Sequence, residues 1–197
     1  MPSYPDTART VDDVVALLHR DATSSDEPVG ADQPRFTGLD HGLQCAAGLL
    51  RERPDDLELQ VAGLIHDLGH RLTPGEPDLH GVVGGAWVRD LLGDRVSALV
   101  ELHVDAKRYL VATEPGYRGL LSAGSAETLV VQGEALSPDE AAAFEVERHS
   151  ADAILLRRAD EAAKVPGAVV PGLDAWLPVL AAVAASVRGP RGSPAAA

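Results

Sequence analysis

The chain has 197 residues, a formal net charge of −13 at pH 7 and one cysteine. That length fits a single domain with a substantial core, and the acidic balance argues against nucleic-acid binding, which depends on Lys and Arg. No apolar run approaches the length of a membrane span, and the first residues lack a secretory signal, so we expect a cytoplasmic protein. Cys45 has no partner for an internal disulfide, which agrees with a reducing compartment.

Apolar residues recur at helical spacing along most of the chain, whereas alternating strand patterns are weak. Ser137, Pro138 and Glu140 mark one helix start clearly, because they supply an N-cap, a first-position proline and a capping box. Segments 21–34 and 72–80 are rich in loop-forming residues, and 113–133 predicts a turn and a short helix. The predicted helices span 11–20, 37–53, 55–70, 82–92, 95–104, 137–148, 151–164 and 174–187.

These elements predict an all-α bundle formed by one domain over residues 1–187, with its core over 36–165. The segment 188–197 is rich in glycine, proline and alanine, and we expect a disordered tail there. Cys45 follows His41 by one helical turn, and we expect it to be a small core residue.

The segment VAGLIHDLGH, residues 61–70, places His66 beside Asp67 after an apolar run. Imidazole and carboxylate are common ligands for divalent metals, and a carboxylate can serve two metals through its two oxygens. An adjacent His-Asp pair alone is weak evidence, and each single histidine more often has a packing or surface role. The full set of candidate ligands, spread over about 120 residues, changes that balance: His41, His66, Asp67, His80, His103 and Asp160.

The order of these residues resembles the HD-domain superfamily of metal-dependent proteins. Most members are phosphohydrolases, and a smaller branch, which includes myo-inositol oxygenase, are mixed-valence di-iron oxygenases. The chain resembles the phosphonate-cleaving enzymes of that branch over roughly residues 36–165. The matching stretches are LDHGLQCAAGLL, AGLIHDLGH, HVDAKRYL, Tyr117 with LLSAGSAETLVVQGE, and LRRADEAAK. HVDAKRYL and LSAGSAETLVVQG are specific to the branch, whereas HDLGH is widely shared.

The resemblance implies a dinuclear metal site in the core of an HD-domain helical bundle. One iron would be held by His41, His66, Asp67 and Asp160, and the other by Asp67, His80 and His103. The phosphonate of a small anionic organophosphonate would be held by His70, Lys107, Ser125, Gln132 and Arg157. Asp67, His70 and Lys107 would form the catalytic group. The implied cofactors are Fe(II) and Fe(III), with O2 as cosubstrate, and the implied products are inorganic phosphate and a carboxylic acid.

Helical spacing supports a shared cavity, because Lys107 and His70 each follow a proposed ligand by about one turn and Arg157 precedes Asp160 by three residues. These cations would give an acidic protein a local anion-binding pocket. The opposing interpretation is that Lys107 and Arg157 are solvated surface charges. Their neighbours Arg108 and Arg158 are expected to point outward.

The sequence departs from the amino-phosphonate enzymes at Ala31 and Pro34, where those enzymes carry a tyrosine and a glutamate, and Asp32 is out of register. An unpaired buried ammonium is costly, so we expect a substrate without one, such as hydroxymethylphosphonate. His80 is followed by Gly81, whereas the phosphonate-cleaving enzymes more often have an acidic residue at that position. Two alternatives remain open: an HD phosphohydrolase acting on a nucleotide or other phosphomonoester, and a non-catalytic HD module. The sequence defines no oligomeric state.

Overall fold

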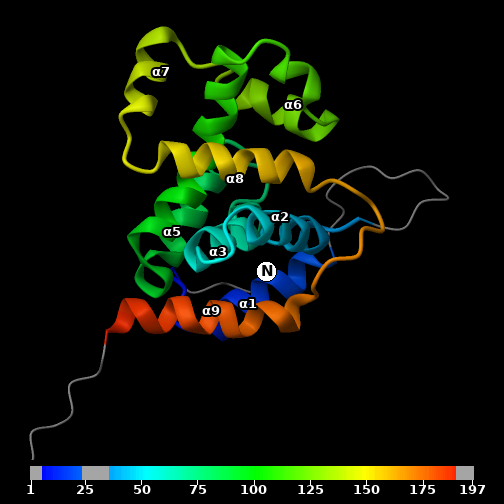
Figure 1. Cartoon of the computed structure of the whole chain (residues 1–197), viewed down its shortest axis with the longest axis vertical. Coiled ribbons are helices and arrows are strands. Elements are labelled where there is room, and N and C mark those ends of the chain that lie inside the picture. Colours follow the sequence, from blue (N-terminus) through cyan, green and yellow to red (C-terminus); the bar gives the residue numbers. More distant parts are fainter. Residues whose placement is uncertain (1–5, 24–35, 190–197) are drawn as a thin grey trace, which may run out of the picture.

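The computed structural model describes residues 6–23 and 36–189, and within these ranges the chain is helical without a strand, which confirms the all-α prediction. Among these residues, no helix combines the length and hydropathy needed to cross a bilayer. In chain order the elements are α1 (Val11–Asp21), α2 (Gly38–Glu52), α3 (Leu57–Ile65), α4 (Gly69–Leu72), α5 (His80–Thr113), the 3₁₀ turn η1 (Tyr117–Leu120), α6 (Ala123–Val131), α7 (Pro138–Glu145), α8 (Ser150–Ala162) and α9 (Leu173–Arg188) (Figure 1).

Capping boxes begin three of these helices. In each, a threonine or serine accepts from the backbone N–H three residues on, and the acidic residue there accepts from the cap's own N–H. The predicted box of Ser137 and Glu140 is confirmed at the start of α7. The other two pair Thr10 with Asp13 and Thr37 with Asp40. Local sequence therefore sets where α1, α2 and α7 begin.

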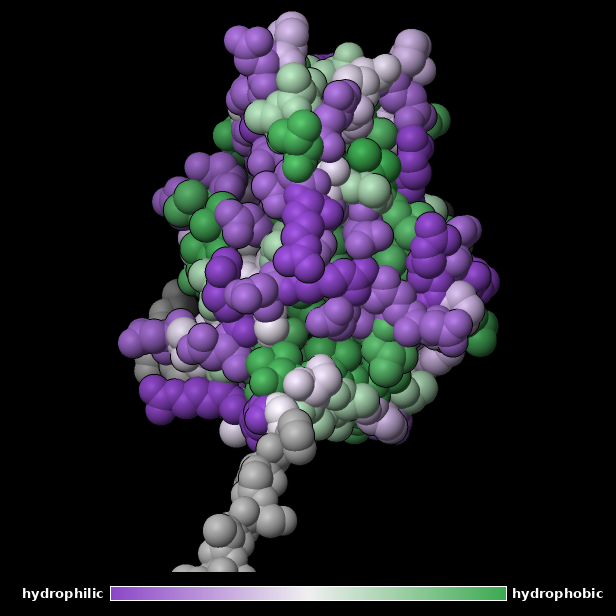
Figure 2. Space-filling model, turned by 60° about the vertical axis from the view of Figure 1, so that its left-hand side comes forward, coloured by the Kyte–Doolittle hydropathy of each residue, from purple (hydrophilic) through white to green (hydrophobic). Residues whose placement is uncertain are grey.

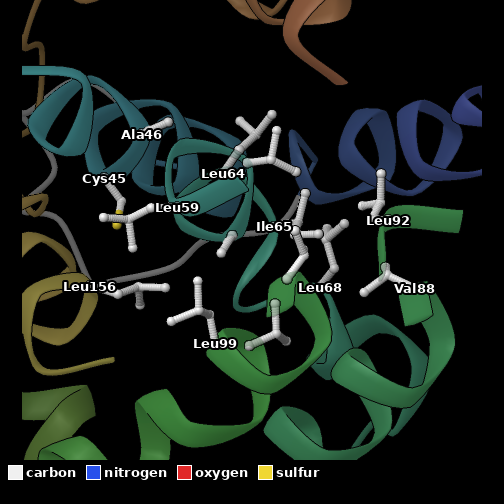
Figure 3. Close-up of a cluster of buried hydrophobic side chains, with 14 of the residues drawn as sticks. Cys45, Ala46, Leu59, Leu64, Ile65, Leu68, Val88, Leu92, Leu99 and Leu156 are labelled. Carbon is white, nitrogen blue, oxygen red and sulfur yellow. The ribbon is translucent and has the colours of Figure 1, made fainter. Parts of the chain in front are cut away.

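The hydrophobic core lies where α2, α3, α5 and α8 pack together. Figure 3 shows Leu59 of α3 beside Cys45 of α2, with Leu156 of α8 and Leu99 of α5 below them. Cys45 is fully buried in this cluster, as expected for a small core residue. This core holds the four helices whose ends and turns carry the candidate ligands.

The helices follow one another along the long axis of the molecule, and α8 runs across its middle (Figure 1). On one side of α8 lie α6, α7 and the C-terminal part of α5. On the other side of α8, at the opposite end of the molecule, lie α1 and α9. Figure 2 shows mainly hydrophilic side chains across the middle of one face, with hydrophobic ones gathered beneath them. The candidate site residues described below come from α2, the turn after α3, α5, α6 and α8.

Two predicted helix boundaries were wrong near the candidate ligands. The helix predicted over 55–70 ends at Ile65, and His66, Asp67 and Leu68 form a turn before the short α4. The helices predicted over 82–92 and 95–104 are two parts of α5, which bends at Gly93 and continues to Thr113. Gly93 has φ +88°, a conformation that glycine adopts without a steric penalty, and this explains the break in the pattern.

Smaller differences concern helix ends. The helix predicted to reach Arg148 ends at Glu145, and the last helix includes Arg188, where the tail was predicted to begin. The tail itself, residues 190–197, and most of the predicted loop 21–34 lie outside the described residues, as do Ala31, Asp32 and Pro34.

Candidate metal centre

Four histidines and two aspartates meet between α2, the turn after α3, α5 and α8. We call His41, His66, Asp67, His80, His103 and Asp160 the metal cluster. Each of its histidines is at most 3% exposed. His66 and Asp67 are adjacent in sequence, and side chains at such positions diverge on a helix. The turn after Ile65 brings His66 Nε2 within 3.3 Å of Asp67 Oδ2, so the early end of α3 allows both residues to face one centre.

The backbone orients all four imidazole rings in the same way. Each ring places Nδ1 at hydrogen-bond distance from a backbone carbonyl, so Nδ1 carries the hydrogen and Nε2 presents its lone pair to the centre. For three of the histidines the carbonyl belongs to the residue three positions earlier in the same turn. The pairs are His41 with Ala163 (3.1 Å), His66 with Gly63 (2.8 Å), His80 with Pro77 (2.6 Å) and His103 with Val100 (2.5 Å).

Asp67 divides the metal cluster into two groups. Its Oδ2 lies 3.5 Å from His41 Nε2 and 3.3 Å from His66 Nε2, and Asp160 Oδ1 completes this side at 3.1 Å from His41 Nε2. Its Oδ1 lies 3.4 Å from His80 Nε2 and 3.6 Å from His103 Nε2. The two oxygens of Asp67 thus face different sets of nitrogens, as a bridging carboxylate would.

The donor atoms of both groups fit bound cations. The Nε2 atoms of His41 and His66 are 3.2 Å apart, and those of His80 and His103 are 3.0 Å apart. When an imidazole is neutral, the carbonyl at Nδ1 keeps the hydrogen there and leaves the Nε2 lone pair free to bind a metal. The paired Nε2 atoms of each group could therefore bind one cation together, with release of any proton that they carry.

Charge favours cations at the same place. Burial lowers the pKa of an imidazole, and it lowers the pKa of His103 to about 4. At His41 and His66 the carboxylates Asp160 and Asp67 outweigh burial, and they raise the pKa of His66 to about 9. Burial opposes ionisation of both aspartates, yet nearby imidazoles and, for Asp160, Arg157 hold their pKa values well below the ordinary range. The buried Asp160 and the partly buried Asp67 are therefore ionised at neutral pH, and they attract a metal as they attract a proton.

His70 lies at the edge of the second group. Its ring stacks on that of His80 with centroids 3.9 Å apart, and its Nε2 lies 3.9 Å from Asp67 Oδ1. Asp67, His70 and His80 present ligand atoms close enough to hold one ion, so this position suits a ligand as well as a substrate contact. Burial lowers the pKa of His70 to about 3, so the ring is neutral near pH 7.

Three cations surround Ser125 beside the metal cluster, and we call Lys107, Ser125, Arg157 and Lys164 the cationic wall. Lys107 Nζ donates to Ser125 O at 3.3 Å and to Thr128 Oγ1 at 2.9 Å. Ser125 Oγ accepts from Lys164 Nζ at 2.7 Å and from Arg157 at 3.2 Å. Lys107 and Arg157 are 4% and 3% exposed, which excludes the interpretation that they are solvated surface charges.

Arg157 links the two regions. Its guanidinium donates to Asp160 Oδ2 and Glu161 Oε2 as well as to Ser125 Oγ, and its Nε donates to the hydroxyl of Tyr117 at 3.2 Å. These contacts occupy four of its five N–H groups, which leaves one for a ligand. Since Asp160 Oδ1 faces the histidines, Arg157 also orients this carboxylate toward the metal cluster.

The metal cluster and the cationic wall line one cavity of about 460 Å³. Five of the six candidate ligands reach it, and His66 lies behind them. All five predicted substrate contacts line it. The lining includes His41, Asp67, His70, His80, His103, Lys107, Ser125, Gln132, Arg157, Asp160 and Lys164. Gln132 donates to Pro77 O at 3.1 Å, so it also holds the loop before His80.

Sequence reasoning missed Lys164, Thr128 and Glu161. Lys164 follows Asp160 by four residues, the spacing that identified Lys107 after His103, so the same rule would have found it. The expectation for the neighbouring arginines holds in part. Arg158 is about half exposed and pairs with Glu114, whereas Arg108 is mostly buried and pairs with Asp105 and Glu140. Arg108 thus connects α5 to α7 through Glu140, and the prediction that it points outward was wrong.

The HD-domain profile matches residues 39–163 of the chain. A hydroxymethylphosphonate dioxygenase of Gimesia maris is 36% identical over 149 residues, which cover 71% of this chain and 74% of that protein. A [1-hydroxy-2-(trimethylamino)ethyl]phosphonate dioxygenase (glycine-betaine-forming) of Leisingera caerulea is 32% identical over 136 residues, 65% of this chain and 69% of that protein. The chain belongs to the HD-domain family, within the group that contains these phosphonate dioxygenases.

Proposed function

We propose that this protein is a di-iron dioxygenase that uses O2 to cleave the C–P bond of a 1-hydroxyphosphonate, releasing inorganic phosphate and a carboxylic acid. One observation supports this most directly: a cluster suited to two metals and a wall suited to a phosphonate line the same cavity. The names of the two relatives point to the same chemistry. The single buried cysteine agrees with a cytoplasmic location, which we also propose.

The residues divide into two proposed metal sites. His41, His66, Asp67 and Asp160 would hold one iron, and Asp67, His80 and His103 would hold the other. The mixture of imidazole and carboxylate donors suits iron, with Asp67 bridging. Bound iron would supply O2 activation and a binding point for the substrate hydroxyl.

The chain's own residues would orient the substrate and balance its charge. Lys107, Lys164 and the remaining N–H of Arg157 would bind phosphonate oxygens with charge-assisted hydrogen bonds. Their fixed positions would hold the hydroxyl-bearing carbon toward the metal cluster. The reaction balances without another reductant: a hydroxyphosphonate and O2 together contain the atoms of the carboxylic acid and phosphate. In the overall balance each product gains one oxygen atom.

The cavity favours a substrate without an ammonium group. Among the described residues that line it, the carboxylates are Asp67 and Asp160, and both face the histidines. A buried ammonium would need another acceptor. We therefore propose hydroxymethylphosphonate, or a 1-hydroxyphosphonate with a neutral chain, as the substrate.

Anaerobic reconstitution with iron, followed by parallel assays of O2 consumption and phosphate release, tests this function. Hydroxymethylphosphonate should consume one O2 per phosphate released, at least as efficiently as 2-amino-1-hydroxyethylphosphonate. A tenfold or greater preference for the amino compound, about 1.4 kcal/mol, would refute the substrate choice and leave C–P cleavage intact. Phosphate release from phosphomonoesters without O2 would instead identify a phosphohydrolase.

A further inference from the structure

Glu161 follows the candidate ligand Asp160, but its carboxylate faces the cationic wall. One oxygen, Oε1, accepts from the backbone N–H of Ser122 at 2.7 Å. The other, Oε2, accepts from the Arg157 guanidinium and lies 3.7 Å from Lys164 Nζ. The side chain is only 12% exposed, so water does not replace these contacts easily.

These contacts join α8 to the beginning of α6. Ser122 is the N-cap of α6, and its hydroxyl accepts from Ser125 N–H at 3.2 Å and from Lys164 Nζ at 3.0 Å. Ser125 in turn receives hydrogen bonds from Arg157 and Lys164. Glu161 therefore contacts the backbone that positions Ser125. It also lies beside Arg157 and Lys164, the two cations that donate to the Ser125 hydroxyl.

The negative charge of Glu161 lies where three positive side chains are close together. Lys107, Arg157 and Lys164 repel one another when they are buried together, and a flexible lysine can turn away from its neighbours. Burial chiefly, and then the charge of Arg157, lowers the pKa of Lys107 to about 7. A carboxylate placed behind Arg157 and Lys164 offsets that repulsion.

We propose that Glu161 is a positioning residue: it holds Arg157, Lys164 and the start of α6 in the arrangement that binds the phosphonate. This inference rests on the proposed anion-binding role of the cationic wall. It differs from a purely electrostatic role, in which the negative charge of Glu161 would only weaken the attraction for an anion.

Inorganic phosphate is the probe that separates the two roles, because its binding to metal-loaded protein can be measured by calorimetry without turnover. Glu161→Gln keeps an acceptor for Ser122 N–H but removes the charge beside Arg157 and Lys164. A positioning role predicts phosphate affinity about tenfold weaker, because charge-assisted contacts to a bound anion are lost. The KM for hydroxymethylphosphonate should rise in parallel, whereas kcat should stay within about twofold.

Glu161→Asp provides the second measurement. It keeps the charge, but it is one methylene shorter and cannot span from α8 to both Ser122 and Arg157. A positioning role predicts that this variant is also impaired; affinity equal to that of the parent would overturn it. Tighter phosphate binding by Glu161→Gln would overturn it as well.

Glu114→Gln is a matched control, because Glu114, at the end of α5, pairs with the exposed Arg158 of α8, the helix that also carries Glu161. It should leave phosphate affinity and KM unchanged. Metal content and melting temperature show whether each variant folds. If the parent binds phosphate but converts no hydroxyphosphonate, the proposed function fails while the comparison of Glu161 variants still stands.

Discussion

The metal cluster and the cationic wall share one cavity but are held in place in different ways. The histidines of the metal cluster are fixed by hydrogen bonds to backbone carbonyls, and they arise from helices that pack on the core. The cationic wall is fixed by side-chain contacts between α5, α8 and α6, and α6 packs less closely than the core helices do. Metal binding and anion binding should therefore respond to different substitutions.

The largest effect should come from the residue that unites the metal cluster. Asp67→Ala removes the carboxylate that faces both groups of histidines. Since even outer partners of metal ligands change activity by about 10- to 100-fold, we expect activity to fall by more than about 100-fold. Elemental analysis should give two irons per chain in the parent and fewer in the variant. A parent with one tightly bound metal would reject the dinuclear site.

The second prediction separates the cationic wall from the metal cluster. Lys107→Ala should keep both metals and cost about 2–4 kcal/mol in kcat/KM, because one charge-assisted contact is lost. The pKa of Lys107 is about 7, so the lysine is charged below that pH and neutral above it. The parent-to-variant ratio of kcat/KM should therefore be larger at about pH 6 than at about pH 8.5.

Taking the ratio cancels the ionisation of the substrate, and the charged neighbours of Lys107, namely Arg157, Lys164, Asp67 and Asp160, are present in both proteins. Arg158→Ala, which removes an exposed charge on α8, should leave kcat/KM unchanged. A ratio near one at every pH would mean that Lys107 does not bind the anion.

The smallest expected effect concerns the packing that supports the metal cluster. Gly42 of α2 lies so close to α3 that an added Cβ would stand 2.4 Å from the carbonyl oxygen of Leu64. Gly42→Ala should lower the free energy of unfolding by about 1–3 kcal/mol and weaken metal binding, because His41 would move away from His66. Chemical unfolding and metal analysis measure both effects.

Gly48 of the same helix offers the matched comparison. An added Cβ there makes ordinary contact, with Ala159 Cβ at 3.7 Å, so Gly48→Ala should stabilise the helix by up to about 1 kcal/mol. Equal stability changes at Gly42 and Gly48 would contradict the proposed close packing of α2 on α3.

Local sequence patterns predicted the helical class, a clear helix start and the types of residue available for metal and anion binding. Helical periodicity and capping depend on neighbouring residues, which is why Ser137 and Glu140 could be read directly. Spacing along α5 and α8 likewise predicted that Lys107 and Arg157 face the same cavity as the candidate ligands. Such local relations extend over only one or two helical turns.

The way in which these residues combine depends on how the helices pack. The turn after Ile65 orients His66 and Asp67 together, and the carbonyl of Ala163 selects the tautomer of His41 from across the bundle. Glu161 is the clearest example of a residue whose contacts could not be predicted from local sequence. On α8 its spacing resembles that of any exposed acidic residue, and its partner Ser122 lies 39 positions away. Contacts over such separations depend on helix packing, and local sequence does not encode them.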